Sequence, residues 1–287
     1  MRGGGGGLGG LGGAEGESGD GSTAPREVVF FGDSLTYGMS HDRADRYATP
    51  WPRLLAAKLK EHDLGVVECA MCSRTTRFDD VNLDNADWLP DAKPEYFNGQ
   101  KALVPQLLSH SPQWLVLLLG TNDLQRGIQE QYDEERHERG YSYGGGRSRM
   151  TLYDRAEEIA ESCAALANEA CVFFEDLKVV LVTPPPVRLT DDCEDWGFTD
   201  ESVEISKKFP DAFRRVCRRY GFVNANPPAG TGEGEIDMRD SEDGVHITDA
   251  HNSVVAKAVW EAMALENEDD ARPLRRRRPT VPYSSAL

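Results

Sequence analysis

Short apolar runs recur along the middle of the chain, and glycine, proline or polar residues end most of them. The runs are Glu27–Phe31, Gly65–Ala70, Trp114–Leu119, Lys178–Thr183 and Gly221–Asn224. Their apolar positions are consecutive rather than alternating. A strand of that kind is buried on both faces, which is typical of a parallel sheet covered by helices on each side.

Segments with helical spacing alternate with these runs. They are Trp51–His62, Ala102–His110, Thr151–Glu169, Val203–Tyr220 and Asp249–Leu265. In the third of them the apolar residues recur at steps of three and four, with Cys163 on the stripe and Thr151 as the expected N-cap. Strands that alternate with helices predict right-handed βαβ units. The pattern therefore predicts one three-layer α/β/α sandwich with a five-stranded parallel sheet.

Two polar stretches interrupt the alternation. Gln125–Arg149 follows the third strand and Pro227–Glu242 follows the fifth. We expect both to be long irregular excursions. Such loops are often lids or binding loops, so we expect one or both to overhang the functional edge of the sheet.

Composition separates two tails from this middle. Twelve of the 28 glycines lie in residues 1–24, which predicts a disordered Gly-rich tail over residues 1–25. Residues 266–287 carry five arginines and no apolar periodicity, and they form a predicted second tail. The predicted domain spans residues 26–265. The longest apolar runs are too short for a membrane span, and glycine fills the place of a secretory h-region, so we expect a cytoplasmic protein.

The cysteines and the charge exclude further classes. Six cysteines in 287 residues do not make a disulfide scaffold. Cys69 and Cys72 have zinc-like spacing but lack a second pair of ligands, so we expect no metal and no cofactor. The net charge is −17, almost all of it in the predicted domain, which disfavours nucleic-acid binding. Arg275–Arg278 is interpreted as part of a solvated tail, with a nuclear-type signal or an anionic surface contact as alternatives, and a homo-oligomer stays open.

Polar residues with catalytic potential follow four of the predicted elements. Ser34 follows the first strand, Ser73 follows the second, Asn122 follows the third, and Asp243 and His246 follow the fifth strand and precede the last helix. The carboxyl ends of parallel strands lie at one edge of a sheet, so these segments are expected to converge. Together they supply a hydroxyl, an amide, a carboxylate and an imidazole, which is an inventory for acyl transfer by a serine nucleophile.

The chemistry assigns each group an expected role. A serine hydroxyl needs a base, and histidine can take its proton and return it to the leaving group. Asp243 is the expected orienter of His246, because a single turn brings residues three apart together. Oxyanion donors are expected from the backbone N–H groups of Ser34 and Ser73 and from the amide of Asn122. Asp33 and Asp123 are expected mainly to hold loops.

With these residues the sequence resembles the SGNH hydrolases, also called GDSL esterases and lipases. The resemblance rests on three motifs in order: Gly32-Asp33-Ser34-Leu35, Gly120-Thr121-Asn122-Asp123, and Asp243-x-x-His246. It covers residues 27–265. It implies a flavodoxin-like sheet of strand order 2-1-3-4-5, and it implies hydrolysis of carboxylic esters. The stretches around Ser73 and Pro185 look most like the branch of small-ester and aryl-ester hydrolases, some of which transfer acyl groups to alcohols.

One position departs from the family pattern. The family usually has a glycine where this chain has Ser73, whose side chain is expected to narrow the acyl pocket. Further candidates for the substrate pocket are Asp33, Tyr37, Trp51, Arg74, Pro185 and Val245. For Trp51, helix packing is an equal alternative.

The resulting hypothesis is a serine hydrolase that cleaves short acyl or aryl esters. Sugar O-acetyl groups, lysophospholipids and acyl thioesters stay open as substrates of the same site. A non-catalytic binding protein on this fold is the alternative from another class. A nucleotide-binding protein is disfavoured, because the first strand does not end in a glycine-rich phosphate cradle.

Overall fold

The computed structural model describes residues 26–42, 45–79, 94–139 and 151–265, and both predicted tails lie outside them. Five strands form one sheet in the order β2-β1-β3-β4-β5, and every neighbouring pair is parallel. The strands are β1 (Arg26–Gly32), β2 (Leu64–Ala70), β3 (Pro112–Leu118), β4 (Lys178–Val182) and β5 (Val223–Ala225). This arrangement confirms the predicted fold class and strand order.

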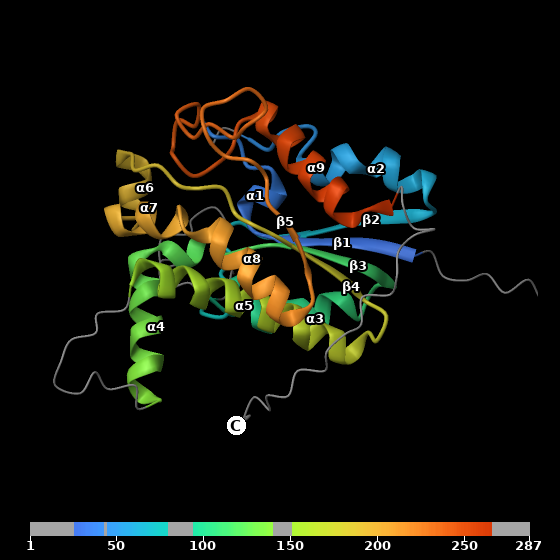
Figure 1. The fold of residues 1–287 in the computed structure, drawn as a ribbon, viewed down its shortest axis with the longest axis horizontal. Coiled ribbons are helices and arrows are strands. Elements are labelled where there is room, and N and C mark those ends of the chain that lie inside the picture. Colours follow the sequence, from blue (N-terminus) through green and yellow to red (C-terminus); the bar gives the residue numbers. More distant parts are fainter. Residues whose placement is uncertain (1–25, 43–44, 80–93, 140–150, 266–287) are drawn as a thin grey trace, which may run out of the picture.

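Helices cover both faces of the sheet, as Figure 1 shows. One face carries α1 (Ser34–Tyr37), α2 (Trp51–Glu61) and α9 (Asp249–Met263), whereas the other carries α3 (Gly99–Leu107), α5 (Leu152–Phe173) and α8 (Phe209–Tyr220). Side chains from each strand alternate between two apolar cores. Val29 and Phe31 of β1 enter the core beneath α5, and Val28 and Phe30 enter the core beneath α9. This two-sided burial explains the consecutive apolar runs.

Several helix boundaries differ from the predicted ones. The predicted helix over Val203–Tyr220 is two helices, α7 (Asp200–Ser206) and α8, since Pro210 lacks an N–H and occupies the start of α8. Thr151 caps α5 as expected, although its reciprocal partner is Asp154. A short helix that the pattern did not predict, α6 (Asp191–Asp195), follows β4. Within the described residues, two 3₁₀ turns, η2 (Pro94–Phe97) and η3 (Asn122–Leu124), complete the elements.

The stretch after β3 is a correction. We expected Gln125–Arg149 to be irregular, yet its first part forms the helix α4 (Arg126–Glu138). Only Ile128 and Tyr132 of α4 are buried, so the sequence of this helix has no apolar stripe from which it could be predicted. Residues 140–149 of the stretch lie outside the described residues.

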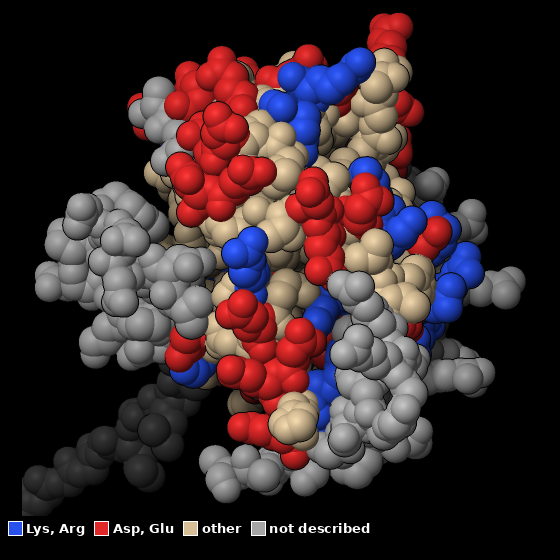
Figure 2. Space-filling model, turned by 90° about the vertical axis from the view of Figure 1, so that its left-hand side faces the viewer, with Lys and Arg blue, Asp and Glu red and all other residues tan. Residues whose placement is uncertain are grey.

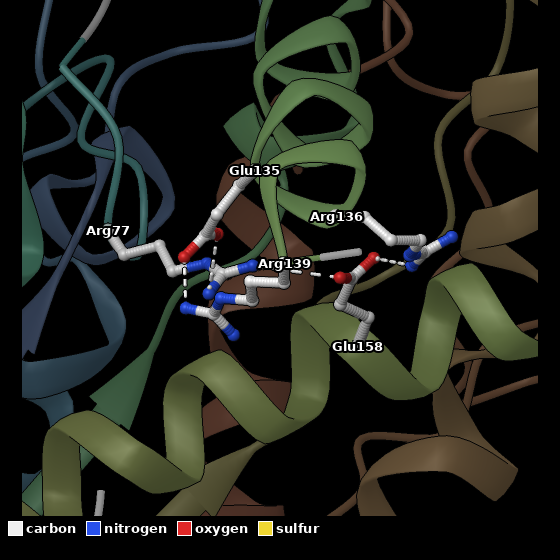
Figure 3. A pocket seen from close by; sticks show the side chains of 5 residues that line it. All are labelled: Arg77, Glu135, Arg136, Arg139 and Glu158. Carbon is white, nitrogen blue, oxygen red and sulfur yellow. Dashed lines mark hydrogen bonds and ion pairs between the residues drawn. The ribbon is translucent and has the colours of Figure 1, made fainter. Parts of the chain in front are cut away.

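Ion pairs hold α4 against the body of the domain (Figure 3). Glu135 of α4 lies 2.9 Å from Arg77, which follows β2, and Arg136 lies 2.7 Å from Glu158 of α5. With Arg139 these residues line a polar pocket of about 250 Å³. Three guanidinium groups and two carboxylates line the pocket, and the ion pairs among them join α4 to α5 and to the segment that follows β2.

Pro227–Glu242 forms no helix or strand, as expected; a single isolated bridge joins Ala229 and Ile236. Among the described residues, no helix is long and apolar enough to cross a membrane.

Candidate active site

Three side chains form a hydrogen-bonded chain beyond the carboxyl end of β1. Ser34 Oγ lies 2.8 Å from Nε2 of His246, and His246 Nδ1 lies 2.6 Å from Oδ2 of Asp243. Ser34 and His246 are 7% and 8% exposed, and Asp243 is fully buried. The sequence separates Ser34 from the other two by more than 200 residues, and the fold brings them into contact as the strand-end argument predicts.

The end of β1 presents Ser34 through a tight turn. A Cβ at Gly32 would lie 2.0 Å from Thr36 Oγ1 and 2.6 Å from the carbonyl oxygen of Leu118, so only glycine fits this approach. Asp33 caps α1 and accepts the N–H of Leu35 at 3.0 Å. The N–H of Ser34 makes no hydrogen bond within the described residues, since the cap uses the donors that follow it.

The loop before α9 holds Asp243 in place. Its Oδ1 accepts the backbone N–H groups of Val245 and His246, each at 2.8 Å, and lies 3.1 Å from Ser241 Oγ. Burial acts to raise the pKa of Asp243, but the hydrogen bonds from the His246 ring and from these N–H groups outweigh burial and hold the pKa below its ordinary value. Asp243 is therefore ionised at neutral pH and faces the imidazole as a carboxylate.

Asn122 and Ser73 lie in the segments that follow β3 and β2. Nδ2 of Asn122 donates to the carbonyl oxygen of Arg74 at 3.0 Å, which leaves its second N–H for another acceptor. Ser73 has φ +62°, the left-handed region that favours glycine. Its backbone N–H makes no hydrogen bond to another described residue. The site thus offers N–H groups from three different loops.

Most of the candidate pocket residues lie away from solvent in the structure. Trp51 is fully buried; its ring packs edge-on against Phe30 and its Nε1 donates to the carbonyl oxygen of Leu35 at 3.1 Å. The helix-packing alternative therefore holds for Trp51. Asp33 and Arg74 are buried, and each makes hydrogen bonds to backbone groups.

The remaining pocket candidates differ in exposure. Pro185 is buried, and the side chain of Val245 belongs to the core beneath α5. Tyr37 alone among the six is partly exposed, and the guanidinium of Arg46 lies over its ring at 4.6 Å.

Two residues beside the catalytic loop escaped the sequence analysis. The ring of Trp196, just after α6, lies 6.0 Å from the His246 ring in an edge-on arrangement, and Thr190 Oγ1 donates to the carbonyl oxygen of Asp243 at 2.7 Å. Thr190 also caps α6. Thr190 followed by acidic residues is a sequence signal for the start of α6. The helix itself has five residues, which are too few to show a helical period of apolar positions.

Carboxylates surround this edge of the sheet. Figure 2 shows the face in which the strands end, and acidic side chains gather over much of it. Asp191, Asp192, Glu194, Asp195, Asp200 and Glu201 are all exposed, and no basic residue lies between Arg188 and Lys207. Among the described residues, no group of three or more His, Cys, Asp or Glu side chains is placed to hold a metal ion.

A five-stranded parallel sandwich with a Ser–His–Asp chain at its carboxyl edge has the architecture of the SGNH hydrolases. Residues 30–252 match the model of the GDSL-like Lipase/Acylhydrolase family, and the chain belongs to that family. It is accordingly a carboxylic ester hydrolase. No curated protein matches the sequence.

Solved structures share the fold. A carbohydrate acetylesterase family member from Sinorhizobium meliloti is 22% identical, with a TM-score of 0.60, over 83% of this chain and 97% of that one. The aryl esterase of M. smegmatis is 23% identical, with a TM-score of 0.58, over 83% of this chain and 98% of that one.

Proposed function

We propose that the protein cleaves short acyl or aryl esters through an acyl-enzyme on Ser34. The observation that carries the proposal is the unbroken chain from Ser34 Oγ through the His246 ring to Asp243, with distances of 2.8 and 2.6 Å. In such a chain the imidazole takes the serine proton as the oxygen attacks. The carboxylate orients the ring and stabilises the imidazolium that forms.

The reaction has two balanced halves. Ser34 Oγ attacks the ester carbonyl carbon while its proton passes to His246 Nε2. The tetrahedral oxyanion accepts hydrogen bonds from the backbone N–H groups of Ser34 and Ser73 and from the side-chain amide of Asn122. Collapse of this intermediate expels the alcohol, which takes the proton from His246.

Deacylation repeats the same steps with water. His246 removes a proton from the water as its oxygen attacks the acyl carbon, and then returns a proton to Ser34 Oγ. The products are a carboxylic acid and the free enzyme. An alcohol in place of water would yield a new ester, so adding methanol to the assay measures acyl transfer directly.

Two features support small substrates. The side chain of Ser73 stands where the family usually has no side chain, and the neighbours of known fold bear the names acetylesterase and aryl esterase. A series of p-nitrophenyl esters should therefore give its highest kcat/KM below about six acyl carbons, because the side chain of Ser73 leaves no room to bury further methylenes, each of which would gain about 0.8 kcal/mol if buried. An optimum at ten or more carbons would refute the assignment to short acyl groups.

The decisive experiment is intact-protein mass after fluorophosphonate treatment, together with p-nitrophenyl acetate turnover. Wild type is expected to gain one adduct, and Ser34→Ala is expected to gain none and to lose turnover by roughly 10⁴-fold or more. Ser253→Ala, an exposed serine on α9, is the matched control and should behave like wild type. Wild-type turnover in folded Ser34→Ala protein would rule out the mechanism.

A further inference from the structure

Arg74 is a buried cation at the carboxyl edge of the sheet. It is 1% exposed, and its Nη1 donates to the carbonyl oxygens of Gly32 at 3.0 Å and Cys69 at 2.6 Å. Its guanidinium also lies over the Phe31 ring, 4.2 Å from the centroid. A charge is kept in such a place only where partners offset its lost hydration. One side chain thus ties the end of β1 to the end of β2.

The backbone of the same residue reaches a third strand. The carbonyl oxygen of Arg74 accepts Nδ2 of Asn122, which follows β3, at 3.0 Å. Arg74 also follows Ser73 directly, and its bond to Gly32 fixes the backbone two residues before Ser34. A single residue therefore contacts or adjoins all three segments that carry the N–H groups of the site.

The cation has an electrostatic partner in the turn that follows β1. Burial raises the pKa of Asp33, the cap that precedes Ser34, to about 7, and the positive charge of Arg74 opposes that rise. Burial lowers the pKa of Arg74 to about 10, so the guanidinium stays protonated at neutral pH. Loss of the cation would leave the Asp33 carboxylate without its positive neighbour and would remove the side-chain hydrogen bonds that join the ends of β1 and β2.

We propose that Arg74 is a positioning residue that aligns the three donors of the oxyanion hole. The inference rests on the proposed function, since it assigns a role within that site. The Arg74 side chain is closed off from substrate, so its influence passes through the backbone at Gly32 and Ser73 and through the amide of Asn122. Arg74 is one of the candidate pocket residues, and its burial favours a role in the layer beneath the substrate.

The first test is the split between kcat and KM in folded variants. Arg74→Met keeps the length and removes the donors, and it should lower kcat on p-nitrophenyl acetate by about 10- to 100-fold, because losing one well-aligned donor costs about 10²–10³. KM should change less than about threefold. Arg74→Lys retains a cation and a donor, and it should recover part of the loss. If Arg74→Met does not fold, Arg74→Lys replaces it in the test: a kcat below that of wild type supports the proposal, and an unchanged kcat contradicts it.

Arg155→Met is the matched control. Arg155 of α5 is 8% exposed and pairs with Asp133 of α4 and with Glu158 of α5, rather than with the carbonyl oxygens that end β1 and β2. Its replacement also removes a buried guanidinium, and kcat should stay within about twofold of wild type. An equal loss of kcat in both variants would show a general effect of lost stability and would overturn the inference.

The second test is a double-mutant cycle with Asn122→Ala. If Arg74 acts by aligning this amide and its neighbours, the two losses overlap, and the double variant should lie within about threefold of the slower single variant. Losses in kcat that multiply fully would mean independent roles and would contradict the proposal.

The adduct experiment separates the two levels of the argument. A wild type that forms no adduct on Ser34 overturns the proposed function and this inference with it. An adduct in wild type, combined with unchanged kcat in folded Arg74→Met and Arg74→Lys, overturns the inference alone.

Discussion

Replacing Ser73 by glycine should make the protein more stable. An L-residue in the left-handed region costs about 1–2 kcal/mol, and Ser73 has φ +62°. Glycine removes that cost but loses about 0.5–1 kcal/mol more backbone entropy on folding. The difference predicts a gain of about 0.5–1 kcal/mol in the free energy of unfolding. For a domain of this size, that corresponds to a rise in Tm of about 1–4 °C in calorimetry.

Asp63→Gly and Ser73→Ala are the controls. Asp63 has φ +55° in the exposed turn between α2 and β2, so it precedes β2, whereas Ser73 follows the opposite end of that strand. Its replacement should give a similar or smaller gain, because aspartate tolerates this region better than serine. Ser73→Ala removes the hydroxyl but keeps the Cβ, so it should show no such gain.

The same substitution should change the substrate range. The N–H of residue 73 survives in Ser73→Gly, so kcat on p-nitrophenyl acetate is expected to stay within about threefold. The vacated side-chain space should favour longer acyl groups, and one methylene accommodated in a pocket is worth about tenfold or more in kcat/KM. The ratio of hexanoate to acetate turnover should therefore rise in Ser73→Gly and stay constant in Asp63→Gly.

Two results would refute this reasoning separately. A less stable Ser73→Gly beside a more stable Asp63→Gly would mean that the Ser73 side chain contributes more than its backbone conformation costs. A stabilised variant with an unchanged ratio of hexanoate to acetate turnover would mean that residue 73 does not border the acyl group.

Other perturbations test the rest of the edge. Because the pKa of Asp33 is raised from 3.8 to about 7, the native state binds the extra proton, so stability from this group falls between about pH 4 and pH 7, by up to about 4 kcal/mol. Asp33→Asn should remove that slope in urea titrations, and an identical slope would contradict the assignment. Gly244→Ala places a Cβ 2.0 Å from the Arg188 carbonyl oxygen beside Asp243, whereas Gly221→Ala, at nearly the same φ, meets nothing within 4 Å. Gly221→Ala should lose about 1–2 kcal/mol and keep kcat, whereas Gly244→Ala should lose more stability and kcat together; equal losses in both would refute the clash. The acidic edge should give acetylcholine a higher kcat/KM than an anionic acetate ester. Because salt screens the carboxylates, this preference should be smaller at about 500 mM NaCl than at about 20 mM. A preference that does not change with salt would exclude electrostatic steering.

The sheet was predictable because its signal is redundant. Each strand of the sheet's centre has apolar side chains on both faces, so Phe31 and Leu117 mark their strands without any need for periodicity. The rule that ligand-binding residues follow parallel strands then brings Ser34 and Asn122 to one edge. Asp243 and His246 were found by their spacing, and the structure shows the hydrogen bond that this spacing allows.

The misses have physical causes. A helix held by ion pairs, such as α4, has no apolar stripe, and a helix of five residues, such as α6, is shorter than two turns. Trp196 was missed because its place depends on α6. The burial of Arg74 is also invisible in the sequence, because arginine is ordinarily exposed and its partners are backbone carbonyl oxygens, which carry no residue-type signal.

Ser73 and Arg74 show how neighbouring positions can differ in what they tolerate. The left-handed backbone at Ser73 belongs to a tight turn in which the N–H of Arg74 donates to the carbonyl oxygen of Met71 at 3.2 Å, and Arg74 holds Gly32 and Asn122 beside that turn. A serine can therefore occupy a position suited to glycine at a cost of about 1–2 kcal/mol, with its N–H still directed by its neighbour. Substitution at residue 73 should therefore alter stability and substrate range, whereas substitution at residue 74 should alter the rate of the chemical step.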